Sequence, residues 1–231
     1  MRVVIAGGHG KIALLLAPLL TERGDKVESL IRKPEQEGDI TTTGARAVVL
    51  DLEHATLADV AAAIRGCDAV VFAAGAGPGS GAQRKYTVDK GGSVLLATAA
   101  EQAGVRRFVQ ISTMGAGAPP SAGTDEVWAA YIDAKTQAED DLRARDLDWT
   151  ILRPGSLLDT PATDRVTLGP PPLPRGSVPR ADVAAALAEI LHAPQTAGTT
   201  LEIVSGETSV ASAIENLNNQ TVAEGGAAAT D

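Results

Sequence analysis

Short runs of apolar residues recur along the chain and are separated by longer segments with helical spacing. The runs are mostly continuous rather than alternating, as in strands that are buried on both faces of a parallel sheet. They predict strands at residues 2–6, 26–31, 46–50, 69–74, 107–112, 148–153 and 200–205. The segments between them predict helices near residues 11–23, 56–65, 83–103, 127–145, 181–192 and 208–217. This alternation predicts an α/β fold, a doubly wound parallel sheet with helices on both faces.

Two segments fall outside this pattern. Residues 156–180 are rich in proline, and a connection of that length in a compact domain is often a functional lid, so we predict an irregular lid there. Residues 218–231 lack apolar periodicity and are predicted to be a disordered tail. The remainder predicts one domain over residues 1–217, with a small C-terminal lobe.

A glycine-rich turn connects the first predicted strand to the first predicted helix. The stretch "VVIAGGHGKIALLL" places Gly7, Gly10 and Ala13 in the G-x-x-G-x-x-G/A spacing. One glycine permits the tight turn, a second lets the backbone approach a pyrophosphate, and the small third residue lets helix and strand pack closely. The helix N-terminus offers N–H groups and a partial positive charge to phosphates. In this context the motif indicates a dinucleotide site, with candidate contacts at Gly7, Gly8, His9, Gly10, Lys11 and Ile12.

The ends of the next strands predict further contacts to the dinucleotide. NAD sites usually carry an acidic residue at the end of the second strand, whereas this chain has Arg32 and Lys33 there. Two cations suit the 2′-phosphate of NADP, which we predict as the cofactor, with NAD as the alternative. Asp51 and Leu52 end the third strand, where the aspartate can bind the adenine amino group. Ala73, Ala74 and Gly75 form a small-residue turn after the fourth strand, over which the cofactor can lie.

Composition and charge narrow the class of protein. The net charge of −9 argues against nucleic acid or an anionic membrane as the main partner. A single cysteine, Cys67, allows no internal disulfide, and the three histidines lack metal-ligand spacing, so we predict no metal site. No apolar stretch is long enough to span a bilayer. We expect a cytoplasmic protein that acts on a small molecule, and we leave a homodimer open.

Taken in order, the glycine turn, "VVLDLE", "FAAGAG", "FVQISTMGA", "YIDAK" and "LDWTILRPGSLLD" resemble the short-chain dehydrogenase/reductase superfamily. The closer resemblance is to its atypical branch of small NAD(P)-binding proteins, often described as NAD-dependent epimerases or NmrA-like proteins. It extends over about residues 1–217. The resemblance implies a Rossmann fold whose small C-terminal lobe would hold the substrate.

The resemblance also implies a catalytic set. The family pattern Tyr-x-x-x-Lys matches Tyr131 and Lys135, which lie about one helical turn apart and so on one face of a helix. The family's catalytic hydroxyl corresponds to Thr113, with Ser112 as the alternative, and its proline-glycine turn beside the nicotinamide corresponds to Pro154 and Gly155. A phenol with a pKa of about 10 needs a nearby cation to act at neutral pH, which Lys135 would supply while it also holds the nicotinamide ribose.

Three functions are compatible with this set of residues. The leading hypothesis is an oxidoreductase that transfers hydride between NADP(H) and a small carbonyl or alcohol, with Tyr131 passing the proton. A sugar epimerase or dehydratase that retains NAD is the alternative enzyme. A redox sensor that binds NADP without turnover is the alternative from another class.

Overall fold

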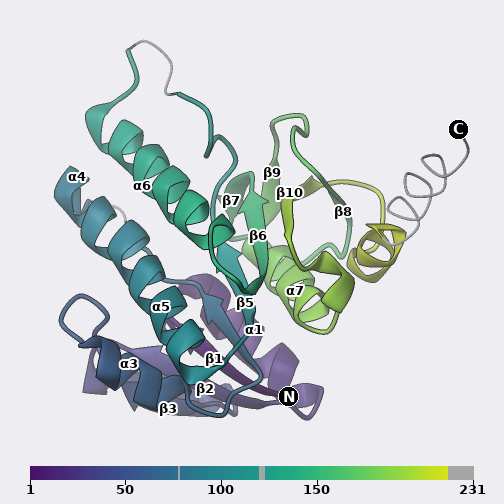
Figure 1. The fold of residues 1–231 in the computed structure, drawn as a ribbon. Helices are drawn as coiled ribbons and strands as arrows, with labels where there is room; N and C mark the ends of the chain where they lie inside the picture. Colours follow the sequence, from purple (N-terminus) through teal and green to yellow (C-terminus); the bar gives the residue numbers. More distant parts are fainter. Residues whose placement is uncertain (78, 120–122, 218–231) are drawn as a thin grey trace, which may run out of the picture.

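An eight-stranded sheet runs through the computed structural model, which describes residues 1–77, 79–119 and 123–217 (Figure 1). The predicted tail, residues 218–231, lies outside the described residues. The order of the strands is β3-β2-β1-β4-β5-β6-β10-β8. Their bounds are β1 (Arg2–Ala6), β2 (Lys26–Ile31), β3 (Arg46–Val49), β4 (Ala69–Phe72), β5 (Arg107–Ile111), β6 (Asp148–Pro154), β10 (Thr199–Ser205) and β8 (Val166–Gly169). The predicted parallel pairing is confirmed for seven strands, whereas β8 pairs antiparallel with β10 at the edge.

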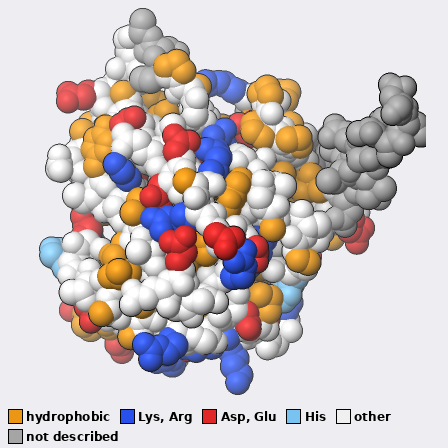
Figure 2. Space-filling view, viewed as in Figure 1, with side chains coloured by type: hydrophobic (Ala, Val, Ile, Leu, Met, Phe, Trp, Pro, Cys, Tyr) orange, Lys and Arg blue, Asp and Glu red, His pale blue; other side chains and the backbone are white. Residues whose placement is uncertain are grey.

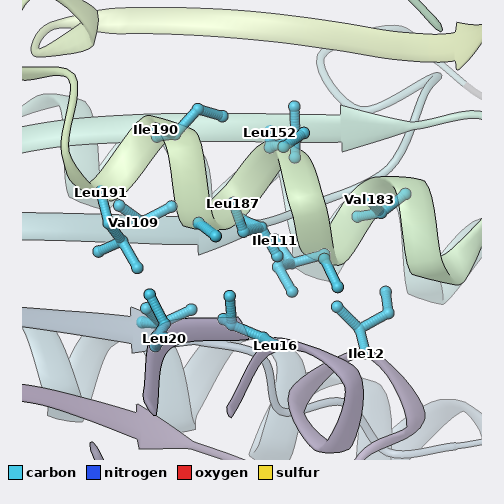
Figure 3. Packing of buried hydrophobic residues seen from close by; sticks show 14 of the residues in the cluster. Ile12, Leu16, Leu20, Val109, Ile111, Leu152, Val183, Leu187, Ile190 and Leu191 are labelled. Atoms are coloured by element: carbon cyan, nitrogen blue, oxygen red, sulfur yellow. The ribbon is translucent and has the colours of Figure 1, made fainter. Parts of the chain in front are cut away.

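Helices cover both faces of the sheet, as the alternating pattern predicts. On one face, α1 (Lys11–Glu22) packs against α7 (Arg180–Leu191), and Figure 3 shows Leu16 and Leu20 of α1 directed toward this interface. A second buried cluster lies on the opposite face, under α3 (Leu57–Ile64), α5 (Ser93–Ala103) and part of α6 (Glu126–Arg143). The fold is therefore a single Rossmann-like α/β domain with two apolar layers.

Two helical segments differ from the prediction. Residues 34–42, which we did not assign to a helix, form a 3-10 turn, η1 (Pro34–Gln36), and α2 (Glu37–Thr42). Ile40 is their only buried residue, so the segment carries no apolar periodicity to detect. The helix predicted at 83–103 consists of α4 (Gly81–Arg84), the π-helix η2 (Lys85–Gly92) and α5.

Near the C-terminus, η3 (Pro194–Thr196) precedes β10, and residues 210–217 are helical.

The proline-rich segment is more ordered in its backbone than the sequence predicts. We expected residues 156–180 to be irregular, and this is wrong in part because they contain three short strands. β7 (Ser156–Leu158) pairs with β9 (Ser177–Pro179) in a separate two-stranded sheet, while β8 joins the main sheet. Strands of three or four residues have too little alternation of their own to be recognised, and their pairing partners lie far away in the sequence.

Candidate functional site

Two adjoining pockets lie beyond the carboxyl ends of the parallel strands. The smaller has a volume of about 290 Å³ and the larger of about 820 Å³. They meet at the turn after β4, because Ala73, Ala74 and Gly75 line both. This edge of the sheet, where the strand order changes direction between β1 and β4, is where doubly wound folds bind their ligands.

The glycine turn forms part of the smaller pocket. Gly7 has a φ of +81°, and a Cβ atom built on it would lie 2.5 Å from the Cα atom of Ala74. Gly10 is the N-cap of α1, and no side chain caps that helix, so its first N–H groups are left without an acceptor from a capping side chain. An open backbone cradle at the start of a twelve-residue helix fits the pyrophosphate of a dinucleotide.

The other residues predicted for this turn divide into three groups. His9 lines the smaller pocket, and Ile12 lines the larger one. Gly8 lines neither pocket. A Cβ atom there would lie 2.4 Å from the Cβ of Ser29, so this glycine allows close packing against β2. Lys11 also lines neither pocket and instead pairs with Asp159 across 2.7 Å.

Charged side chains also line the smaller pocket. Arg32 is exposed and lines this pocket together with Asp51 and Leu52, whereas Lys33 lines neither pocket. Burial raises the pKa of Asp51, but the Glu53 amide, His54 and the charge of Arg32 together lower that pKa below its usual value. Arg32 is thus close enough to Asp51 to affect its ionisation, and of the two predicted cations it is the one at the pocket.

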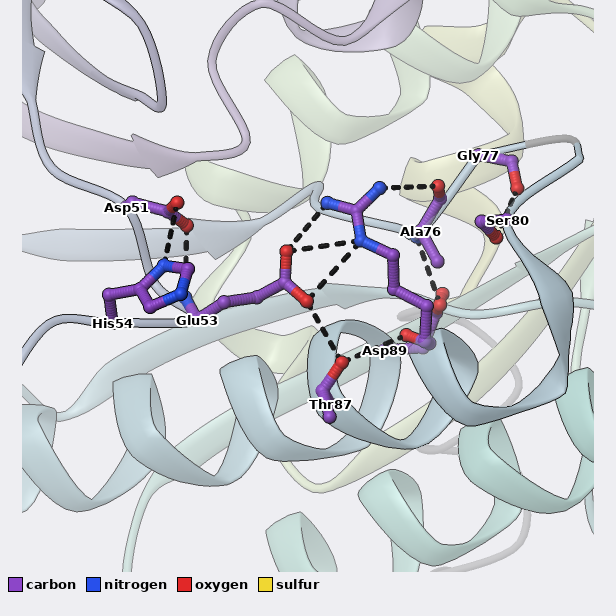
Figure 4. Close-up of polar contacts among 9 residues, drawn as sticks. Asp51, Glu53, His54, Ala76, Gly77, Ser80, Thr87 and Asp89 are labelled. Atoms are coloured by element: carbon purple, nitrogen blue, oxygen red, sulfur yellow. Dashed lines mark hydrogen bonds and ion pairs between the residues drawn. The ribbon is translucent and has the colours of Figure 1, made fainter.

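An ion pair in this pocket was not predicted from the sequence. The guanidinium of Arg84 donates to both carboxylate oxygens of Glu53, with the shortest contact at 2.6 Å. Thr87 donates to the same carboxylate at 2.9 Å (Figure 4). The hydrogen bonds from Arg84 are the largest cause of a lowered pKa at Glu53. Both residues line the smaller pocket. They are 31 positions apart, and although Glu53 ends the stretch "VVLDLE", nothing in the sequence links it to Arg84.

The four predicted catalytic residues come together in the larger pocket. Ser112 and Thr113 follow β5, Tyr131 and Lys135 lie on α6, and all four line the pocket, as do Pro154 and Gly155. Ser112 is buried and its hydroxyl has no hydrogen-bond partner among the described residues, while the Thr113 hydroxyl reaches the Met114 carbonyl at 3.4 Å. A buried hydroxyl without a partner fits a hydrogen bond to a ligand.

Lys135 is held by the fold more tightly than the sequence suggested. Its ammonium lies 3.2 Å from Asp89 Oδ1 and donates to the Ile111 carbonyl at 3.2 Å, and only 4% of the residue is exposed. The contact with Asp89 is an ion pair without hydrogen-bond geometry. The other oxygen of Asp89 accepts the Ala76 amide at 3.0 Å, which fixes the turn after β4. The Lys135 Nζ is 5.9 Å from the centre of the Tyr131 ring.

Tyr131 presents its ring to the larger pocket beside a second aromatic residue. The ring of Trp128 lies 5.3 Å away, centre to centre, and is tilted by 42°. Trp128 lines the same pocket and is 51% exposed. The pocket therefore offers an aromatic wall next to a phenol, a hydroxyl and a buried cation, a set that can position and protonate a small polar molecule.

Three further features of the described residues bear on metal binding, membrane insertion and thiol chemistry. Residues 1–77, 79–119 and 123–217 contain no group of three or more His, Cys, Asp or Glu side chains that could hold a metal ion. No helix in the same ranges is long and apolar enough to cross a membrane. Burial raises the pKa of the Cys67 thiol to about 11, so this cysteine is a packing residue rather than a nucleophile.

Comparison with known proteins identifies the family. Residues 7–194 match the NAD(P)H-binding family model. A Bacillus subtilis protein described as "uncharacterized sugar epimerase YhfK" is 33% identical over 94% of this chain and all of its own. A Bacillus halodurans structure described as a "putative NAD-dependent epimerase/dehydratase" is 34% identical, with a TM-score of 0.86 over 94% of this chain and 99% of its own. The oxidoreductase ylbE from Lactococcus lactis is 27% identical, with a TM-score of 0.81 over 95% and 97%. The chain therefore belongs to the NAD(P)H-binding Rossmann family, in the epimerase/dehydratase-like branch of the atypical short-chain dehydrogenases/reductases.

Proposed function

We propose that this protein is an NADP(H)-dependent oxidoreductase that interconverts a small carbonyl compound and its alcohol. One observation carries the proposal. Ser112, Tyr131 and Lys135 line a single pocket, and that pocket adjoins the glycine-turn pocket at the turn after β4. A substrate in the larger pocket would thus lie next to the reactive end of a dinucleotide that extends from the smaller one.

Each residue has a distinct role in carbonyl reduction. We give the role of orienting the substrate to Ser112, the alternative of the sequence assignment, because its buried hydroxyl lacks a partner among the described residues and can donate to the carbonyl oxygen. Thr113, which the family pattern favours, also lines the pocket and could fill the same role. Tyr131 passes its phenolic proton to the same oxygen while the new C–H bond forms at the carbonyl carbon. The buried ammonium of Lys135 favours the phenolate that this transfer leaves. A bound nicotinamide supplies the hydride, and alcohol oxidation reverses every step.

The proposed cofactor is NADP, with NAD as the alternative. The support is the position of Arg32, whose exposed side chain lines the smaller pocket at the end of β2. A guanidinium there suits a 2′-phosphate, because it can form two parallel charge-assisted hydrogen bonds with it.

Steady-state turnover with a panel of aldehydes and ketones tests the proposal. We expect the purified protein to oxidise NADPH in preference to NADH, and Tyr131→Phe to lower kcat by about 10²- to 10⁴-fold, the usual contribution of general acid catalysis. Tyr86→Phe is the matched control, because the other tyrosine donates its hydroxyl to Asp133 and lines neither pocket. Turnover that survives Tyr131→Phe contradicts the mechanism, and a preference for NADH contradicts the choice of cofactor.

The names of the relatives favour a second candidate. Both the Bacillus subtilis and the Bacillus halodurans protein are described as epimerases or epimerase/dehydratases. The same tyrosine and lysine would serve such a reaction, in which the substrate is oxidised and then reduced on one retained cofactor. This function predicts NAD that co-purifies with the protein and a substrate that isomerises with no net consumption of NADPH. A protein that binds NADP tightly and turns over no member of the panel would instead support the redox-sensor alternative.

A further inference from the structure

The larger pocket differs in charge from the rest of the molecule. The chain carries a net charge of −9, and on the face shown in Figure 2 acidic and basic side chains lie interspersed. In the pocket, by contrast, cationic side chains outnumber carboxylates. The cations are Lys85, Lys135, Arg175 and Arg180, and the carboxylates are Asp89 and Asp125.

Both carboxylates already have partners in the fold. Asp89 pairs with Lys135 and accepts the Ala76 amide. Asp125 caps α6, where it accepts the Trp128 amide at 3.0 Å. Arg180 is paired as well, with Asp159 across 2.7 Å. Lys85 and Arg175 are the two lining cations that form no ion pair with the described residues.

Lys85 is a buried cation without a carboxylate partner. The residue is 8% exposed, and its ammonium donates to the Gly77 carbonyl at 2.8 Å. The same nitrogen lies 5.6 Å from the centre of the Tyr131 ring, so it faces the proposed proton donor. An ammonium removed from water and left without a counterion is costly, and one carbonyl and one ring compensate only in part. Its position on the π-helix η2 is also typical of functional residues.

Arg175 approaches the pocket from the proline-rich segment. It lies in the loop between β8 and β9, is exposed, and makes no hydrogen bond or ion pair within the described part of the chain. A guanidinium presents its donors in a fork that matches a carboxylate or a phosphate. Two cations from separate segments thus line the same pocket as Tyr131.

We propose that the substrate is an anion, a carbonyl compound bearing a carboxylate or phosphate group, and that Lys85 and Arg175 bind this group. The inference rests on the proposed function, since it names the class of substrate for the same pocket. Lys85, beside the Tyr131 ring, is the primary ligand of the anion, and Arg175 completes the site from the proline-rich segment. We assign the two cations to the substrate rather than to the phosphates of the dinucleotide, because neither lines the smaller pocket, which contains the glycine turn.

Three para-substituted benzaldehydes test the charge preference. With saturating NADPH, kcat/KM is measured for 4-carboxybenzaldehyde, 4-formylphenyl phosphate and the neutral methyl 4-formylbenzoate. We expect at least one anion to exceed the ester by about tenfold or more, as one charge-assisted hydrogen bond supplies. The comparison of the two anions distinguishes carboxylate from phosphate. Lys85→Met and Arg175→Gln should each lower the preference by about tenfold, whereas Lys85→Arg should retain it.

A matched control and a second readout accompany the kinetics. Lys90→Met removes the same charge from η2, but Lys90 contacts Gln137 and lines neither pocket, so the preference should not change. Binding of each probe is followed by quenching of the exposed Trp128, with Trp128→Phe as the blank. This measurement needs no turnover, so Lys85-dependent binding of an anion without catalysis would support the inference while it contradicts the proposed oxidoreductase.

The inference fails on any of three results. The first is that the ester binds and reacts as well as both anions. The second is that Lys85→Met leaves the preference for the anion unchanged while circular dichroism shows that the protein remains folded. The third is that Lys85→Met and Arg175→Gln weaken the binding of NADPH itself by about tenfold, because these cations would then serve the cofactor.

Discussion

The two pockets are built in different ways. The smaller one lies at the ends of β1 to β4, and its lining includes the glycine turn that a local motif specifies and the small residues that follow β4. The larger one takes charged and aromatic side chains from η2, α6 and the proline-rich segment, which are distant in the sequence. A cofactor shared by many enzymes needs only the first kind of site, whereas a particular substrate requires side chains brought together by the whole fold.

Two lysines near Tyr131 differ in their ionic partners. Their ammonium nitrogens lie at similar distances from the ring centre, 5.9 Å for Lys135 and 5.6 Å for Lys85. Lys135 forms an ion pair with Asp89, whereas Lys85 has no carboxylate partner among the described residues. We therefore expect Lys135 to contribute to both the stability of the fold and catalysis, and Lys85 mainly to the binding of substrate.

The largest effect on stability is expected from breaking the buried ion pair. Lys135→Met leaves the Asp89 carboxylate, 1% exposed, without a counterion, and should lower the free energy of unfolding by about 3–5 kcal/mol. Asp89→Asn should be costly in the same way. The double variant should lose less than the sum of the two, because no unpaired charge remains. Urea denaturation of all four proteins measures this coupling, and strict additivity would contradict the pairing.

A glycine substitution tests the smaller pocket. Gly7→Ala places a Cβ atom 2.5 Å from the backbone of Ala74, so the turn must move and the affinity for NADPH should fall on the order of 100-fold, about 2.7 kcal/mol. Gly24→Ala is the matched control. Gly24 also has a positive φ, +88°, but nothing lies within 4 Å of its added Cβ, so it should lose about 1 kcal/mol of stability and no affinity. Fluorescence titration with NADPH separates the two variants, and equal affinities would contradict the cradle.

The difference between the pockets also explains what the sequence can predict. The seven parallel strands of the main sheet and the glycine turn were predicted because each depends on neighbouring residues, a continuous apolar run or a fixed spacing of glycines. The family pattern singled out Tyr131 and Lys135, and both line the larger pocket. The pattern alone cannot show that Lys135 is paired with Asp89, since that contact joins α6 to a π-helix whose hydrogen bonding leaves no signature in the sequence.

Long-range contacts account for what sequence analysis missed. The strands β7 and β9 are three residues long and pair only with each other, and β8 depends on β10 for its position. Arg84 and Lys85 are consecutive in a polar stretch, yet one lines the smaller pocket and the other lines the larger. Nothing in their residue types distinguishes them, because the division depends on where the helix passes between the two pockets.

The smallest predicted effect concerns Glu53 and Arg84, the ion pair of the smaller pocket. Their side chains are 19% and 34% exposed, so solvent screens the pair and Glu53→Gln should cost about 1 kcal/mol at pH 7. The exposed Glu37, which forms no ion pair with the described residues, provides the control. Glu37→Gln removes the same charge and should change the free energy of unfolding by less than about 0.5 kcal/mol.

The pH dependence of that cost identifies its cause. Arg84 lowers the pKa of Glu53 in the folded protein, so the pair stabilises fully above the carboxyl's unfolded pKa of about 4.3. The stabilisation is lost as the pH falls through the lower, folded pKa, where the carboxylate takes up a proton. The difference in unfolding free energy between wild type and Glu53→Gln should therefore stay constant from pH 7 to 5 and shrink below about pH 4. A difference that persists in acid would mean that Glu53 acts through packing or neutral hydrogen bonds, and the smaller pocket would then owe its stability to shape rather than to charge.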